Sequence, residues 1–253
     1  MGIKKTTIIT LAIVGLAVII VATLTYYRTT EEELSTVPMD TSESSANIPS
    51  FPEQTNNQLV SIENPNDLDE IKKAFSDFVS EPAKANIAYT GVRVIRFADN
   101  KGKLLSLSTI SSSLGITIPK TLADLVEDED YDIFYCSSGD GEKDYGLILY
   151  ARSAVGRSLN EGDYKNIVGQ MKQWESSMLR DLHLILFPNI SFSETELGQK
   201  LLFRDGNVRF TEIQMPDGTK GSINYKQFGD SIMITSSLEC LSNGSGYFFD
   251  IEE

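Results

Sequence analysis

The stretch YDIFYCSSGDGEKDYGLILYA, which runs from Tyr131 to Ala151, decides the fold of this chain. Its two flanks, Asp132–Cys136 and Tyr145–Ala151, are short runs of mainly aliphatic and aromatic residues, which are typical of strands. Between them, Gly139–Asp144 is rich in glycine and aspartate, which turns favour for their backbone freedom. Two strands joined by so short a loop predict a β-hairpin, and therefore antiparallel pairing.

Further strands are predicted on both sides of this hairpin. They are expected at Ile87–Phe97, Leu104–Ser108, Val208–Gln214, Ser222–Phe228 and Ser231–Thr235. Turn-forming residues, such as Asp99–Gly102 and Pro216–Gly218, join several of these segments directly. An antiparallel sheet is therefore favoured over a parallel sheet built from βαβ units.

Helices are predicted between the groups of strands. The first is expected to begin at Asp67, with Glu70 as its capping-box partner, and to end at Pro82. Its predicted apolar face comprises Leu68, Ile71, Phe75, Phe78 and Val79. The longest helix is expected at Asn160–Leu182, where apolar residues recur every three or four positions. Shorter helices are expected with Pro119 at the first position and at Ser237–Leu241. Residues 67–253 are thus expected to form a mixed or antiparallel α+β domain, built as one core or as two small lobes.

The N-terminal part of the chain has the properties of a membrane anchor. No charged residue lies between Thr6 and Tyr27, and as a helix this run would extend roughly 33 Å, enough to cross the bilayer core. Lys4 and Lys5 precede the run, so the positive-inside rule predicts a cytoplasmic N-terminus and an extracytoplasmic body. Residues 1–28 are therefore expected to be a retained anchor. A cleaved signal peptide is the alternative, although the apolar run exceeds the usual length of roughly 7–15 residues.

Residues 29–66 are expected to be a disordered linker. Proline, serine, threonine and glutamate dominate this stretch, and no apolar periodicity persists in it. Such a segment cannot bury enough apolar surface to offset the entropy of ordering it.

The overall composition excludes several classes of function. The chain has 253 residues and a formal net charge of -14, so nucleic-acid phosphates would repel it. A single histidine and two cysteines leave little material for a zinc site. No glycine-rich phosphate-binding motif is present, and no cofactor is expected.

The residues that could carry catalysis form no recognisable motif. His183 is the only histidine, and it is expected to be a partly buried residue near a helix C-terminus rather than a catalytic base. Asp140, Glu142 and Asp144 alternate as calcium ligands do, but Lys143 lies among them and no glycine follows at the required position. No catalytic residue and no metal ligand is therefore assigned.

Cys136 and Cys240 are the two cysteines. In an oxidising compartment they could form one disulfide that closes a long loop. Two separate buried thiols are the alternative.

Several segments between about residues 110 and 240 together form a pattern of hydrophobic and turn residues. They are Leu114-Gly115 with Ile118-Pro119, Tyr131–Tyr135, Tyr145–Leu149, Trp174-Glu175 with Met178, and Ser222–Tyr225 leading to Ile232–Ser237. This pattern resembles uncharacterised single-pass membrane-anchored envelope proteins of candidate-phyla (small-genome) bacteria. The resemblance implies a bacterial envelope protein and brings no catalytic residue with it.

The favoured function is a non-catalytic, extracytoplasmic binding or scaffolding domain of the cell envelope. It would contact the bilayer through residues 6–27 and a protein of the envelope or cell surface through its folded body. The alternative is an envelope hydrolase that acts on peptide or glycan through acidic residues such as Asp140 and Glu142.

Overall fold

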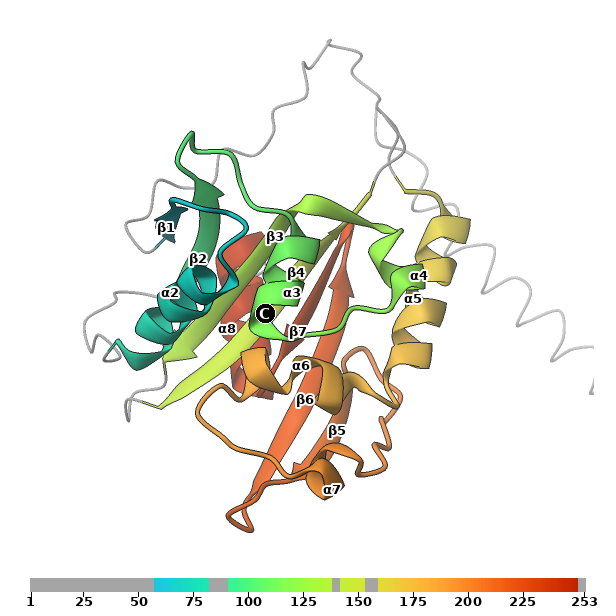
Figure 1. Cartoon of the computed structure of the whole chain (residues 1–253). Coiled ribbons are helices and arrows are strands. Elements are labelled where there is room, and N and C mark those ends of the chain that lie inside the picture. Colours follow the sequence, from blue (N-terminus) through green and yellow to red (C-terminus); the bar gives the residue numbers. More distant parts are fainter. Residues whose placement is uncertain (1–56, 82–90, 138–141, 153–158, 250–253) are drawn as a thin grey trace, which may run out of the picture. The chain divides into compact units, whose positions relative to one another are not determined.

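A sheet of seven strands forms the centre of the protein, in the order β1-β2-β3-β4-β7-β6-β5 (Figure 1). The computed structural model describes residues 57–81, 91–137, 142–152 and 159–249. The strands are β1 (Asn57–Ile62), β2 (Val92–Asp99), β3 (Val126–Ser137), β4 (Lys143–Ala151), β5 (Arg209–Gln214), β6 (Lys220–Phe228) and β7 (Ser231–Thr235). The helices are α2 (Leu68–Ser80), α3 (Leu107–Leu114), α4 (Lys120–Ala123), α5 (Glu161–Trp174), α6 (Met178–Leu186), α7 (Glu194–Leu197) and α8 (Leu238–Phe249).

The hairpin at the centre of the sheet confirms the α+β class. β3 and β4 pair antiparallel, with Tyr135 opposite Tyr145, and β4 then pairs antiparallel with β7. Among the described strands only β1 and β2 run parallel. Because one sheet contains strands from both ends of the folded region, the body is one domain rather than two small lobes.

The two faces of the sheet are covered by different helices. Helices α2 to α6 lie on the face turned toward the viewer in Figure 1, and α8 lies behind the sheet. Ile133 and Tyr135 point into the larger core on the first face, whereas Phe134 and Cys136 point into the smaller core beneath α8. This two-sided cover explains why the central strands are almost continuously apolar here, since neither face of β3 meets solvent between Tyr131 and Cys136.

The folded body begins earlier than expected. Residues 57–66 were assigned to a disordered linker, but β1 lies there and pairs with β2, and Ile62 is fully buried. Only alternate residues of this short strand face the core, so its apolar signal is weak. The rest of the predicted linker and the predicted anchor, residues 1–28, lie outside the described residues. No helix within the described part of the chain is both long and apolar enough to cross a bilayer.

The first helix begins at Asp67 as expected, but Glu70 has a different role. Asp67 accepts hydrogen bonds from the backbone of Asp69 and Glu70. The Glu70 carboxylate reaches back past the cap and accepts from the N–H groups of Glu63, at 2.9 Å, and Asn64, at 3.1 Å. Leu68 was expected on the apolar face, yet it is 42% exposed.

Two other expectations are wrong. Leu104–Ser108 is not a strand, because Ser106 caps α3 by accepting a hydrogen bond from the Thr109 N–H at 3.1 Å. The acidic run Glu127–Asp130 lies in β3, next to an irregularity in the pairing with β4. The short C-terminal helix extends from Leu238 to Phe249.

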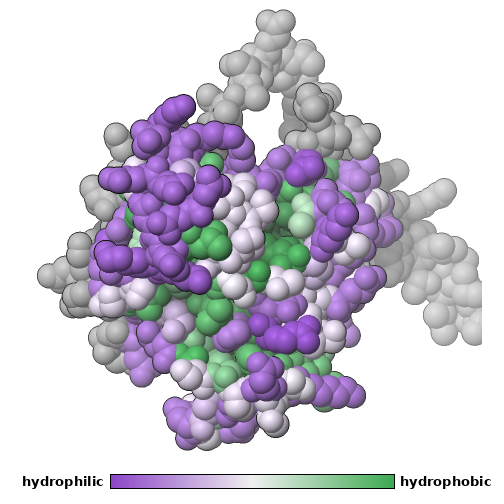
Figure 2. Space-filling model, in the orientation of Figure 1, coloured by the Kyte–Doolittle hydropathy of each residue, from purple (hydrophilic) through white to green (hydrophobic). Residues whose placement is uncertain are grey.

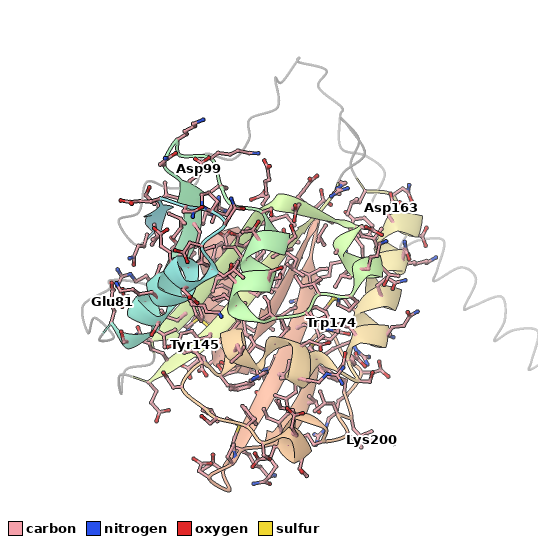
Figure 3. All side chains as sticks on the ribbon, viewed as in Figure 1. Glu81, Asp99, Tyr145, Asp163, Trp174 and Lys200 are labelled. Carbon is pink, nitrogen blue, oxygen red and sulfur yellow. A yellow bond between two sulfur atoms is a disulfide. The ribbon has the colours of Figure 1, made fainter. Side chains whose placement is uncertain are left out.

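The long helix predicted at Asn160–Leu182 is broken into α5 and α6. Asn160 caps α5, and Trp174, labelled in Figure 3, ends it. The Trp174 indole N–H donates to Asp181 at 2.9 Å, and the Ser177 hydroxyl donates to the same carboxylate oxygen at 2.6 Å. These bonds satisfy a buried carboxylate at the break, so the chain changes direction there without leaving polar groups unpaired.

Candidate functional site

A cavity of about 430 Å³ lies at one end of the sheet, where β4 and β6 begin and β7 ends. The loop that follows α6 and the turn between β5 and β6 form its remaining walls. Tyr145, labelled at this end of β4 in Figure 3, is one of its lining residues. The lining combines hydroxyl, amide and charged side chains with the apolar groups of Leu186, Phe187, Pro188 and Met215.

Asp144 is the central polar residue of this cavity. Its Oδ1 accepts a hydrogen bond from the Ser236 hydroxyl at 3.0 Å, and its Oδ2 accepts from the Ser237 hydroxyl at 2.6 Å. Ser236 in turn accepts from the Tyr145 N–H at 2.9 Å. Both oxygens of the carboxylate are therefore used to tie the start of β4 to the end of β7.

The same network fixes the start of α8. Ser237 accepts a hydrogen bond from the Cys240 N–H at 3.0 Å, as a helix N-cap residue does. Cys240 is joined to Cys136 by a disulfide, with an S–S distance of 2.10 Å and a Cα–Cα distance of 5.4 Å. The helix that covers the rear face of the sheet is thus attached covalently to β3 close to the cavity.

Lys143 is adjacent to Asp144 in the chain, but its side chain binds the C-terminal end of α2. Its ammonium group donates to the backbone carbonyl of Val79 at 2.8 Å and also to that of Glu81, and it lies 4.5 Å from the centre of the Tyr135 ring. Burial lowers the pKa of this ammonium. A cation that binds the last carbonyls of a helix stabilises the helix C-terminus. Lys143, the first residue of β4, therefore caps the C-terminus of α2.

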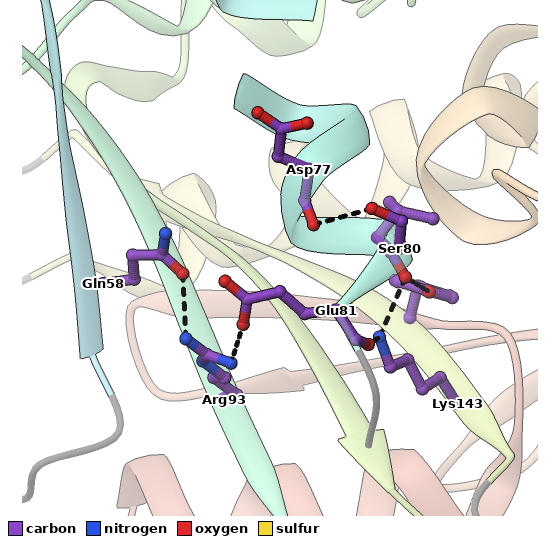
Figure 4. Close-up of polar contacts among 8 residues, drawn as sticks. Gln58, Asp77, Ser80, Glu81, Arg93 and Lys143 are labelled. Atoms are coloured by element: carbon purple, nitrogen blue, oxygen red, sulfur yellow. Dashed lines mark hydrogen bonds and ion pairs between the residues drawn. The ribbon is translucent and has the colours of Figure 1, made fainter. Parts of the chain in front are cut away.

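Glu81 extends this contact to the edge of the sheet (Figure 4). Arg93 on β2 forms an ion pair with the Glu81 carboxylate and donates to Gln58 on β1 at 3.0 Å. The end of α2 is thereby connected to three strands of the sheet. Lys143 and Arg93 are therefore both engaged in holding α2 against the sheet.

Tyr145 and the loop after α6 define the inner wall. Burial raises the pKa of Tyr145 to about 12, so the phenol remains neutral at physiological pH, and it lies 3.5 Å from the Val79 carbonyl. A second cavity, of about 320 Å³, opens on α2, α3 and α6 and is mainly apolar, with Phe75, Val79 and Leu184 among its lining. Both cavities share Pro188 and Asn189, so a single loop separates them.

The helix-covered face of the molecule is apolar between its helices. Figure 2 shows hydrophobic side chains gathered in the middle of this face, surrounded by hydrophilic ones. Leu184, which lines the apolar cavity, is 38% exposed. A partner could therefore bury apolar groups on this face beside the polar cavity.

The candidate residues inferred from sequence have different positions. Glu142 lies on the lining of the polar cavity, whereas Asp140 lies outside the described residues. His183 is on α6, where its Nδ1 lies 2.9 Å from the Arg180 carbonyl, and it does not line this cavity. Within the described residues, no group of three or more potential metal-ligating side chains comes together.

Sequence reasoning did not identify Ser236, Ser237 or Lys143 as parts of a site. Asp144 is separated from the two serines by more than ninety positions. Only the pairing of β4 with β7 brings them together, and no spacing motif indicates that pairing. The turn character of Gly139–Asp144 indicated a surface feature, but not its partners.

Comparison with known proteins adds no relative to this picture. Searches with the chain found no matching family model, no matching curated protein and no matching solved structure.

Proposed function

We propose that the folded body is a non-catalytic binding domain, which the N-terminal segment holds at the outer side of the cell membrane. The ligand site is the polar cavity at the end of the sheet, together with the apolar cavity across the Pro188–Asn189 loop. The partner is a protein of the cell envelope.

The observation that carries this proposal is the engagement of Asp144 and Lys143. Asp144 binds two serine hydroxyls and Lys143 binds two backbone carbonyls, so both charges stabilise the fold around the cavity. General acid–base catalysis requires a group that is placed to exchange a proton with a substrate. Two charges bound in this way instead give a rigid, preorganised surface, which favours binding.

The disulfide supports the extracytoplasmic placement. Cys136 and Cys240 form a bridge in the structure, and disulfides persist mainly in oxidising compartments. This agrees with the orientation that Lys4 and Lys5 predict for the N-terminal segment.

A photo-crosslinking experiment tests the ligand site. A photoreactive amino acid would replace Asn189, which is exposed and borders both cavities, in the full-length chain expressed in cells. The matched control position is Leu202, which is 69% exposed and lines neither cavity. We expect one discrete adduct from position 189, identified by mass spectrometry, and none from position 202. The same adduct at both positions, or none at 189, would contradict the site.

The hydrolase alternative is tested on the same chain. Purified full-length protein and its Glu142→Gln variant would be incubated with a panel of peptides and glycans. The binding proposal predicts no turnover by either protein. Turnover that the Glu142→Gln substitution abolishes would establish the hydrolase instead.

A further inference from the structure

The two edge strands of the sheet, β5 and β1, differ in how well their outer backbone groups are covered. β5, at one edge, is covered by the segment that precedes it. The side-chain oxygen of Gln199 accepts a hydrogen bond from the Gln214 N–H at 3.0 Å. The side-chain NH2 group of Gln199 donates to the Gln214 carbonyl at 3.4 Å. Further along, the Arg204 N–H donates to the Phe210 carbonyl at 2.8 Å. These contacts occupy backbone groups that another strand would need.

β1, at the opposite edge, is not covered by any other segment among the described residues. Within the described part of the chain it pairs with β2 alone. Its sequence, NQLVSI, contains no charged residue and no proline, two of the features that prevent edge strands from pairing. Leu59 in the middle of the strand is 61% exposed. Figure 1 shows β1 and β5 at opposite sides of the sheet.

We propose that β1 is a self-association edge, at which two copies of this chain pair antiparallel about a two-fold axis. The occupant is a second copy because β1 carries no charge, so two identical strands can meet there although each chain has a net charge of -14. Pairing of identical strands satisfies both open edges at once. Because β5 is covered, the sheet cannot extend further, and the assembly closes at two copies.

The faces of the sheet restrict the register of this pairing. Val60 and Ile62 point toward the larger core, so Leu59 and Ser61 lie on the opposite face. With a two-fold axis perpendicular to the sheet, corresponding faces of the two copies lie on the same side of the joint sheet. Residues directly opposite each other on antiparallel strands point to the same face. Leu59 must therefore lie opposite a residue of its own face, such as Leu59 or Ser61 of the second copy, and never opposite its Val60.

Disulfide crosslinking of the full-length chain tests this geometry. The Leu59→Cys, Ser61→Cys double variant in membranes, exposed to a mild oxidant, is expected to give a covalent dimer on a non-reducing gel, because it places a thiol pair opposite one another in either register. The Leu202→Cys variant is the matched control, because Leu202 is an exposed leucine in the segment beside the covered edge. Dimer from the first variant alone supports the proposal. No dimer from it, or equal dimer from both, overturns it.

Charge at the edge provides the second measurement. Leu59→Lys and Ser61→Lys each place two like charges close together in the paired state, and both positions are exposed, so the monomer should fold. Sedimentation of the detergent-solubilised full-length chain is expected to show dissociation at a concentration at least about tenfold higher for each variant. Leu202→Lys should leave the dissociation constant unchanged. A dimer that neither edge variant weakens, or a wild-type chain that remains monomeric, would refute pairing through β1.

Discussion

Gly146 lies directly opposite Phe134 in the β3–β4 hairpin. A Cβ atom built at this position would overlap the Phe134 ring, so the aromatic side chain occupies the space that any other residue would need. Phe134 also contacts Phe248 of α8, with ring centroids 5.2 Å apart. Gly146 therefore leaves room for the ring through which β3 contacts α8.

We expect Gly146→Ala to lower the free energy of unfolding by about 1–3 kcal/mol, since the ring must move within a packed core. Denaturant unfolding measures this. Gly169→Ala is the matched control, because no atom lies within 4 Å of the added methyl group and the position is inside α5. The control should stabilise the protein by roughly 0.5–1 kcal/mol, as alanine does in helices. Equal effects of the two substitutions would contradict the packing described for Phe134.

Asp132 is a charged residue that the sheet buries. Its carboxylate forms an ion pair with Arg96 and accepts a hydrogen bond from the Tyr150 hydroxyl at 2.7 Å, with only 1% of its side chain exposed. The ion pair favours the charged guanidinium and raises the pKa of Arg96. Neighbouring Asp130 also approaches Arg96, at 3.7 Å, but is 52% exposed.

Removal of the charge at these two positions should have unequal effects. Asp132→Asn leaves Arg96 partly buried without its main partner, and we expect a loss of about 2–4 kcal/mol of stability. Asp130→Asn should change stability by less than about 1 kcal/mol, because exposed ion pairs contribute little. Thermal and denaturant unfolding of both variants would measure these two losses of stability. Comparable losses from the two would show that Asp132 is not the residue that holds Arg96.

At the level of elements, α8 depends on contacts at its first turn. The disulfide joins it to β3, and Ser237 connects its N-terminus to Asp144 on β4. The rest of the helix packs through Met233, Phe134 and its own aromatic residues. The first turn therefore sets the position of the whole rear layer.

Loss of the disulfide should be costly. We expect a Cys136→Ser, Cys240→Ser double variant to lose about 2–5 kcal/mol, as expected for a bridge that closes so long a loop. Calorimetry with and without a reducing agent provides the control, because reduction should destabilise the wild type and leave the double variant unchanged. A wild type that is insensitive to reduction would show that the bridge does not stabilise the domain.

The elements differ in how well the sequence predicts them. The β3–β4 hairpin and the C-terminal strands were predictable because apolar runs alternate with clear turn residues. Leu104–Ser108 was not, because Ser106 acts as a cap whose effect depends on the following helix. The break between α5 and α6 has no local signal either, since the apolar stripe continues through it and the buried Asp181 is what accommodates it.

At the level of the whole molecule, the candidate site is a product of topology. Asp144 meets Ser236 and Ser237 only because β7 inserts beside β4 in the sheet order. The sequence indicates the solvated turn before β4 and both cysteines, but no spacing rule could pair them with residues of the C-terminal segment. The predicted placement outside the membrane has a different basis, namely the charges around Thr6–Tyr27.

Labelling of intact cells tests this placement, which is the central claim of the binding-domain account. Leu202 is 69% exposed on the folded body, so a Leu202→Cys variant presents an accessible thiol. We expect a small membrane-impermeant maleimide to label this variant on intact cells as fully as after lysis, while the wild type, whose cysteines are bridged, remains unlabelled. Labelling that occurs only after lysis would place the domain inside the cell and contradict the account.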